Sequence, residues 1–156
     1  MKRYLYIIIT IGLFTSCTSS NSNSTKLDSD DFDNIVDRID KFEIEIKPPS
    51  DFQDAEFELF NVNGFHNQRT WVPGSSSWDY KFVVRIDTID ISKWTIGMKE
   101  VEITHYDDSW TKEITKGRKQ NWRTISKPQY FIRSGEDVTM LVFKSEGIIY
   151  KRVTNL

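Results

Sequence analysis

The residue types best suited to recognition chemistry gather in residues 63–79, a connection of 17 residues between two predicted strands. It contains His66, Arg69, Trp71 and Trp78. Indole rings stack on flat ligands and fill apolar pockets, while imidazole and guanidinium groups form hydrogen bonds. Connections longer than about 12–15 residues are uncommon and are often functional. The stretch is therefore a candidate site for a sugar, a peptide or another protein. The alternative is a lid whose two indoles pack onto the domain.

A second candidate is the basic stretch 112–127, in which six cationic side chains accompany one acidic residue. If this stretch forms a hairpin, its tip carries Lys116, Arg118 and Lys119 into solvent. Such a tip suits anionic lipid head groups, at about 1 kcal/mol per cation near the surface. It suits an acidic protein partner equally well. The alternative is a sheet edge whose lysines only protect it from aggregation.

His105, Asp107 and Asp108 raise the question of a metal site, because imidazole and carboxylate groups together suit zinc. His66 is the only other histidine and Cys17 is the only cysteine, so the donor set is too small. We therefore expect no metal site. The chain also has no nucleophile-elbow, zinc-protease or phosphate-binding glycine motif. We accordingly expect no cofactor and no enzymatic activity.

The first seventeen residues have the pattern of an export signal. Lys2 and Arg3 precede an apolar run from Tyr4 to Phe14, and Thr15 to Cys17 follow. This order of charged, apolar and small residues is typical of a secretory signal. The apolar run has 11 residues, whereas a helix needs about 20 to cross a bilayer. The run is too short to remain as a membrane span.

Phe14-Thr15-Ser16-Cys17 resembles the lipobox of bacterial lipoproteins, where the signal is cut directly before a lipidated cysteine. The family prefers leucine at the position of Phe14. The resemblance implies that residues 1–16 are removed and that Cys17 carries a diacylglyceryl group and usually an N-acyl chain. Several acyl chains give durable attachment, whereas one gives marginal binding. The competing interpretation is an unlipidated secreted protein, and no family resemblance covers the mature domain.

The segment after Cys17 predicts a domain held close to a membrane. Residues 18–25 are all Ser, Thr or Asn, so residues 17–28 are expected to form the lipidated start and a flexible tether. Such a tether spans about 17–20 Å. In the family, an aspartate after the cysteine favours the inner membrane. Thr18 stands there, which favours the outer membrane of a two-membrane organism.

Charge bears on the class of partner. The full chain has a net charge of −2, and removing Lys2 and Arg3 with the signal makes it −4. Nucleic-acid binding generally requires a basic face, so we expect no nucleic-acid partner.

Residues 29–156 are expected to form a single α+β domain. The apolar stripe of Phe32, Ile35 and Ile39 predicts one long N-terminal amphipathic helix over residues 29–41. This helix should pack on a mainly antiparallel sheet of about seven strands. Strands are predicted at 42–46, 56–62, 80–89, 100–107, 111–115, 121–126 and 130–133, with a hairpin at 137–143 and 148–153 and a short helix near 91–98.

These features together favour a lipid-anchored lipoprotein of the cell envelope, facing the periplasm or the exterior. Its domain is expected to bind another protein without catalysis, as an inhibitor, immunity or assembly factor. The alternative is a small-ligand binder with a pocket between helix and sheet. An enzyme is the third hypothesis.

Overall fold

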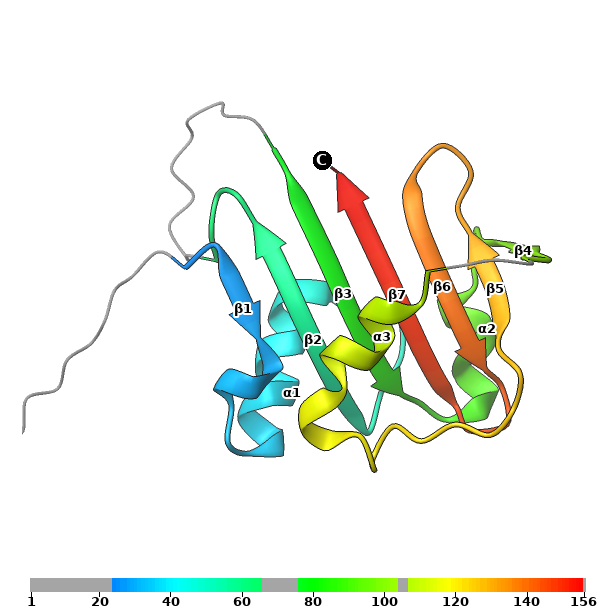
Figure 1. Cartoon of the computed structure of the whole chain (residues 1–156), viewed down its shortest axis with the longest axis horizontal. Coiled ribbons are helices and arrows are strands. Elements are labelled where there is room, and N and C mark those ends of the chain that lie inside the picture. Colours follow the sequence, from blue (N-terminus) through cyan, green and yellow to red (C-terminus); the bar gives the residue numbers. More distant parts are fainter. Residues whose placement is uncertain (1–23, 66–75, 104–106, 156) are drawn as a thin grey trace, which may run out of the picture.

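The domain is built on one antiparallel sheet of seven strands in the order β1-β2-β3-β7-β6-β5-β4 (Figure 1). The computed structural model describes residues 24–65, 76–103 and 107–155. Each pair of neighbouring strands is antiparallel. The strands are β1 (Lys26–Asp28), β2 (Asp54–Asn61), β3 (Trp78–Arg85), β4 (Lys99–Val101), β5 (Gln129–Ile132), β6 (Asp137–Phe143) and β7 (Ile148–Asn155).

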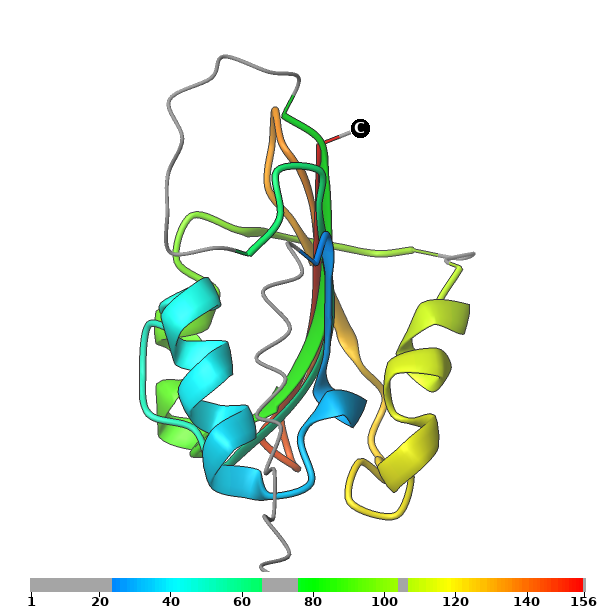
Figure 2. The same cartoon turned by 90° about the vertical axis from the view of Figure 1, so that its left-hand side faces the viewer.

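Short helices cover both faces of the sheet. In Figure 2, α1 (Ile35–Ile46) and α2 (Ile91–Trp94) lie on one face, and α3 (Ser109–Ile114) lies on the other. The described residues also form three 3₁₀ turns: η1 (Ser29–Asp31), η2 (Thr88–Asp90) and η3 (Lys116–Arg118). Within the described residues, no helix is both long and apolar enough to cross a membrane.

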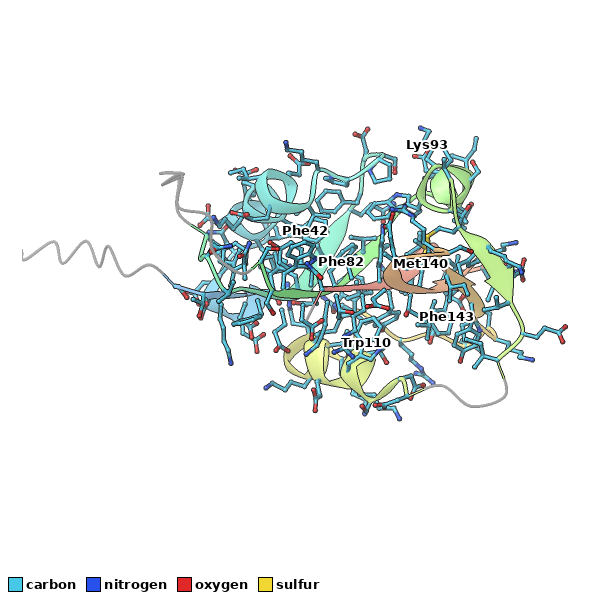
Figure 3. All side chains as sticks on the ribbon, turned by 90° about the horizontal axis from the view of Figure 1, so that it is seen from above. Phe42, Phe82, Lys93, Trp110, Met140 and Phe143 are labelled. Carbon is cyan, nitrogen blue, oxygen red and sulfur yellow. The ribbon has the colours of Figure 1, made fainter. Side chains whose placement is uncertain are left out.

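Two apolar clusters hold these layers together, because successive side chains of a strand point to opposite faces. Phe42, Phe82 and Met140 belong to the cluster under α1 and α2. Val83, the residue after Phe82, belongs to the cluster under α3, where Trp110 covers it. Figure 3 shows Phe42 and Met140 on one side of the sheet and Trp110 on the other. The α1 side is filled by contacting aromatic rings, with Phe42 and Phe82 5.1 Å apart between centroids.

The predicted α+β class with a long N-terminal helix was wrong, because the described domain is mainly β. The side chain of Asp28 accepts a hydrogen bond from the backbone N–H of Asp30 and so caps η1. Asn34 then caps α1 by accepting from the N–H of Asp37 at 2.9 Å. The helix therefore begins six residues later than expected and has 12 residues. The antiparallel sheet itself is present.

The strand predicted at 42–46 was wrong as well, because these residues form the last turns of α1. Alternation of Phe42, Ile44 and Ile46 suits a strand, but Arg38, Phe42 and Ile46 are spaced by one helical turn each. The helix buries Arg38 and Phe42 and leaves Ile44 exposed. Three alternating residues are too few to separate the two periods. By contrast, the predicted terminal hairpin is confirmed as β6 and β7.

Candidate functional site

Residues 107–128 cross the second face of the sheet as α3, η3 and an irregular return to β5. The hairpin predicted for residues 111–126 was therefore wrong. Trp110 and Ile114, one helical turn apart, are buried against the sheet, and Trp122 in the return segment is buried beside them. These three side chains fix the segment as a cover over the sheet, and not as a projecting tip.

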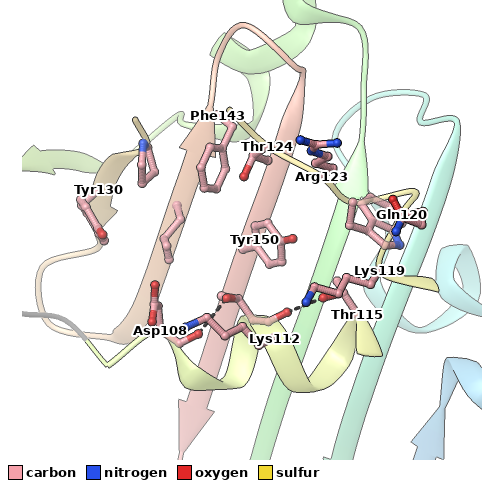
Figure 4. A pocket seen from close by; sticks show the side chains of 14 residues that line it. Asp108, Lys112, Thr115, Lys119, Gln120, Arg123, Thr124, Tyr130, Phe143 and Tyr150 are labelled. Carbon is pink, nitrogen blue, oxygen red and sulfur yellow. Dashed lines mark hydrogen bonds between the residues drawn. The ribbon is translucent and has the colours of Figure 1, made fainter. Parts of the chain in front are cut away.

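An open groove of about 550 Å³ lies between this cover and the sheet (Figure 4). Its floor is apolar and aromatic, whereas exposed cations stand on its covering segment. The volume falls within the range of about 300–1,000 Å³ that is typical of small-molecule pockets. The floor includes Tyr130, Leu141, Phe143 and Tyr150, Trp122 lines the groove from the covering segment, and the charged lining residues are Asp108, Lys112, Lys119 and Arg123.

Tyr150 gives the floor a neutral hydroxyl group. Burial raises the pKa of Tyr150 to about 12, against the opposing effects of a hydrogen bond with the side chain of Thr115 and of the positive charge of Arg85. The phenol ring packs edge-on against Phe143, with centroids 5.9 Å apart, and against Trp110, 6.2 Å apart. Tyr150 is therefore an uncharged, rigidly held part of the site at neutral pH.

A buried carboxylate holds the indole of Trp122 in place. Glu56 of β2 is 1% exposed. Its Oε1 accepts a hydrogen bond from Trp122 Nε1 at 3.0 Å, and its Oε2 accepts one from Ser29 Oγ at 2.8 Å and contacts the guanidinium of Arg118. Burial raises the pKa of Glu56, while the hydrogen bonds from Trp122 and Ser29 oppose the increase. The position of Trp122 thus depends on a residue of β2, the second strand of the sheet.

Two guanidinium groups lie against the part of the edge of β2 that does not pair with β1. β1 pairs only with Glu58 to Phe60. Arg38 donates from Nε to the carbonyl oxygen of Ala55 at 2.8 Å and from Nη2 to Asp54 at 2.6 Å. Arg118 donates to the same carbonyl at 3.4 Å. Because an unpaired edge carbonyl would be costly when buried, these arginines have a structural role.

A second carboxylate fixes the return segment beside the groove. Oε1 of Glu146 accepts hydrogen bonds from the backbone N–H of Ile125 at 3.0 Å and of Ser126 at 2.9 Å, and Oε2 accepts from the Ser126 hydroxyl. The hydrogen bonds from the side chain and backbone of Ser126, with that from Ile125, lower the pKa of Glu146 to about 2. The loop nevertheless leaves Ile125 88% exposed. A large apolar side chain is thus presented to solvent on a rigid support.

Of the residues predicted for the long connection, His66, Arg69 and Trp71 lie outside the described residues, as does the lipidation candidate Cys17. Trp78 is the first residue of β3, half-buried and paired with Asn61 and Asn155.

The three predicted tip residues separate in the structure. Lys116 is exposed, Arg118 turns inward to Glu56, and Lys119 lines the groove. The fold brings Lys119 together with Lys112 and Arg123, which belonged to the basic stretch in the sequence.

His105 of the rejected metal hypothesis also lies outside the described residues. Among the residues that are described, no group of three or more His, Cys, Asp or Glu side chains could hold a metal ion.

Sequence reasoning missed the floor of the groove. Tyr130, Phe143 and Tyr150 lie on predicted strands, but alternation alone does not tell a covered face from an open one. The useful signal was the pair Trp110 and Ile114, whose spacing of four residues suits a helix.

Comparison of the chain with models of protein families, with curated proteins and with solved structures finds no match.

Proposed function

We propose that this protein is a lipid-anchored binding protein of the bacterial cell envelope, whose domain recognises another protein without catalysing a reaction. The observation that carries the proposal is the groove beside α3, with its aromatic floor and its three exposed cations. Buried aromatic residues next to arginine are the side chains that dominate binding energy at protein interfaces. The protein would act as an inhibitor, immunity or assembly factor.

The lipid anchor follows from the lipobox-like residues that end at Cys17. Strand β1 begins at Lys26, shortly after that cysteine in the sequence. Its first residue pairs with Phe60, close to the carboxyl end of β2, whereas the groove lies against the opposite half of the sheet. An anchored domain would therefore carry the groove away from the edge at which the anchor enters.

The anchor is tested by intact mass of the membrane-extracted protein and by fractionation of a Cys17→Ala variant. We expect a chain that begins at Cys17 with the added mass of a diacylglyceryl group. We also expect the alanine variant to lose this mass and its stable membrane attachment. A chain cut elsewhere with a free thiol would contradict the anchor.

The binding role is tested by photo-crosslinking in cells of the native producer. A benzoylphenylalanine placed at Gln120, a lining residue of the groove, should give a discrete adduct with one protein. The matched control is the same probe at Lys93 of α2, an exposed position on the other face of the sheet (Figure 3). Equal adducts from both positions, or none from Gln120, would contradict a protein-binding role for the groove.

A small ligand is the second candidate function, and the volume of the groove favours it. Pockets for small molecules occupy about 300–1,000 Å³, and the groove has about 550 Å³. In this case the adduct at Gln120 would be absent. The tryptophan fluorescence of the purified protein would instead change when an envelope metabolite extract is added.

A further inference from the structure

The charge around the groove is strongly one-sided. Lys112, Lys119 and Arg123 are exposed lining residues, and Asp108 is the single acidic residue among the described ones that line it. Within the part of the chain that the structure describes, none of the three cations has an ion-pair partner. The full chain has a net charge of −2. Positive charge is therefore concentrated at this groove in an otherwise acidic protein.

A ligand that matches the groove needs an apolar group for the floor as well as a negative group for the cations. Leu141 is buried, while Tyr130 and Phe143 are half-buried and present ring surface to the groove. A phosphate or carboxylate alone would leave the apolar floor in contact with water. A ligand that places an aliphatic or aromatic side chain on the rings and a carboxylate against the cations satisfies both parts.

The concave shape distinguishes a peptide from a membrane surface. A bilayer presents a broad surface, which meets protruding cations well but cannot follow a groove to its floor. An extended peptide segment can lie between the covering segment and the sheet, with alternate side chains pointing to the floor and to the cations. The geometry therefore favours a segment of a protein.

Ile125 extends this surface beyond the groove. It directly follows Arg123 and Thr124, which line the groove, and Glu146 holds its backbone. Because the backbone at Ile125 is already held, less conformational entropy is lost when a partner covers its side chain. A partner that fills the groove can therefore gain an apolar contact with Ile125 at small cost.

We propose that the groove binds an acidic segment of a partner protein in which glutamate or aspartate alternates with apolar residues, and that Ile125 anchors the same partner. This inference rests on the proposed function and names the chemistry of its partner. Lys112, Lys119 and Arg123 select the acidic side chains, and Tyr130 and Phe143 accept the apolar ones.

The test uses the lipidated protein in phosphatidylcholine nanodiscs and three synthetic 12-residue peptides. The first alternates Glu with Phe and Leu, and the others replace every Glu by Gln or by Lys. We expect the acidic peptide to bind at least about tenfold more tightly than the Gln peptide, and binding to weaken as salt is raised. Equal binding of the Gln or Lys peptide, or no binding of the acidic one, would overturn the proposal.

Variants make the test specific to the groove. The double variant Lys112→Glu, Arg123→Glu should bind the acidic peptide at least about tenfold more weakly. The double variant Lys112→Arg, Arg123→Lys keeps both charges and should bind it as the unaltered protein does. Ile125→Ser should weaken binding of the native partner. Unchanged binding in the reversed variant, with its circular dichroism unaltered, would refute the role of charge.

The same experiments separate this inference from the proposed function and from lipid binding. If the adduct at Gln120 forms equally in the charge-reversed variant, the binding function stands and the acidic-segment inference falls. If no adduct forms in the unaltered protein, the function itself falls. If the protein binds phosphatidylglycerol vesicles through these cations but does not bind the acidic peptide in phosphatidylcholine nanodiscs, the groove faces lipid head groups and the inference is wrong.

Discussion

The indole Nε1–H of Trp122 donates a hydrogen bond of 3.0 Å to Oε1 of Glu56, a residue 66 positions earlier in the chain. This bond joins the covering segment of the groove to the second strand of the sheet. Arg118 and Ser29 contact the same carboxylate. One buried acid thus links the N-terminal η1, strand β2 and the residues after α3.

Replacing Glu56 by alanine should destabilise the domain by about 2–4 kcal/mol. The variant leaves the Trp122 indole and the Arg118 guanidinium without their buried acceptor, and such a loss is more costly than the loss of a surface pair. Urea unfolding measures the change. The matched control is Glu58→Ala, two residues along the same strand, whose side chain is 39% exposed and 3.4 Å from Lys81. It should cost less than about 1 kcal/mol, and equal losses would refute the central role of Glu56.

Arg118 and Lys116 should behave differently although both were predicted as surface tip residues. Arg118→Ala removes the ion pair with Glu56, so we expect a loss of about 1–3 kcal/mol in the free energy of unfolding. Lys116→Ala changes an exposed side chain and should stay within about 0.5 kcal/mol. Thermal or urea unfolding of the two variants measures both losses. Similar stabilities would mean that the inward orientation of Arg118 contributes nothing.

The contribution of Glu146 should depend on pH. Its pKa in the folded protein is about 2, below the ordinary value of 4.5, so the folded state favours the ionised form. The resulting stabilisation is fully present above pH 4.5 and is lost as pH falls from 4.5 towards 2. The gap in unfolding free energy between the unaltered protein and Glu146→Gln should therefore shrink over this range.

The control for that pH series is Glu113→Gln, an exposed position on α3. Its difference from the unaltered protein should remain small across the range. A gap for Glu146→Gln that stays constant from pH 6 to pH 2 would show that the carboxylate does not hold the loop at Ile125 in its ionised form.

Two glycines with positive φ should tolerate alanine unequally. Gly147, in the β6–β7 turn, has a φ of +62°, and a Cβ there would lie 2.3 Å from the carbonyl oxygen of Ile86. Gly135 has a φ of +78°, but a Cβ would meet open space. We expect Gly135→Ala to cost about 1–2 kcal/mol from backbone strain alone, and Gly147→Ala to cost more. Urea unfolding compares them, and a smaller loss for Gly147→Ala would contradict the close approach to Ile86.

Sequence patterns were sufficient where a segment had one consistent period. In β3, Phe82 and Val84 alternate with Val83, and every second residue falls on the same buried face. The β6–β7 hairpin was predictable for the same reason, with a glycine-containing turn between two apolar strands. These elements depend on local alternation, which the chain carries whatever its surroundings.

The site depended on contacts that the sequence does not carry locally. Residues 111–115 were predicted as a strand, yet they contain a single apolar residue, Ile114, and show no alternation. Trp110 and Ile114, one helical turn apart, are buried against Val83 and Tyr150, and this burial fixes the segment as a helix. Likewise, the sequence predicted that Arg118 is a solvent-exposed cation, whereas the fold places Glu56 beside it. The sequence by itself determined the strands with clear alternation, such as β3, β6 and β7, and the chemical types available. Only the tertiary structure decided which cations face the groove, because ion pairs and burial join residues far apart in the chain.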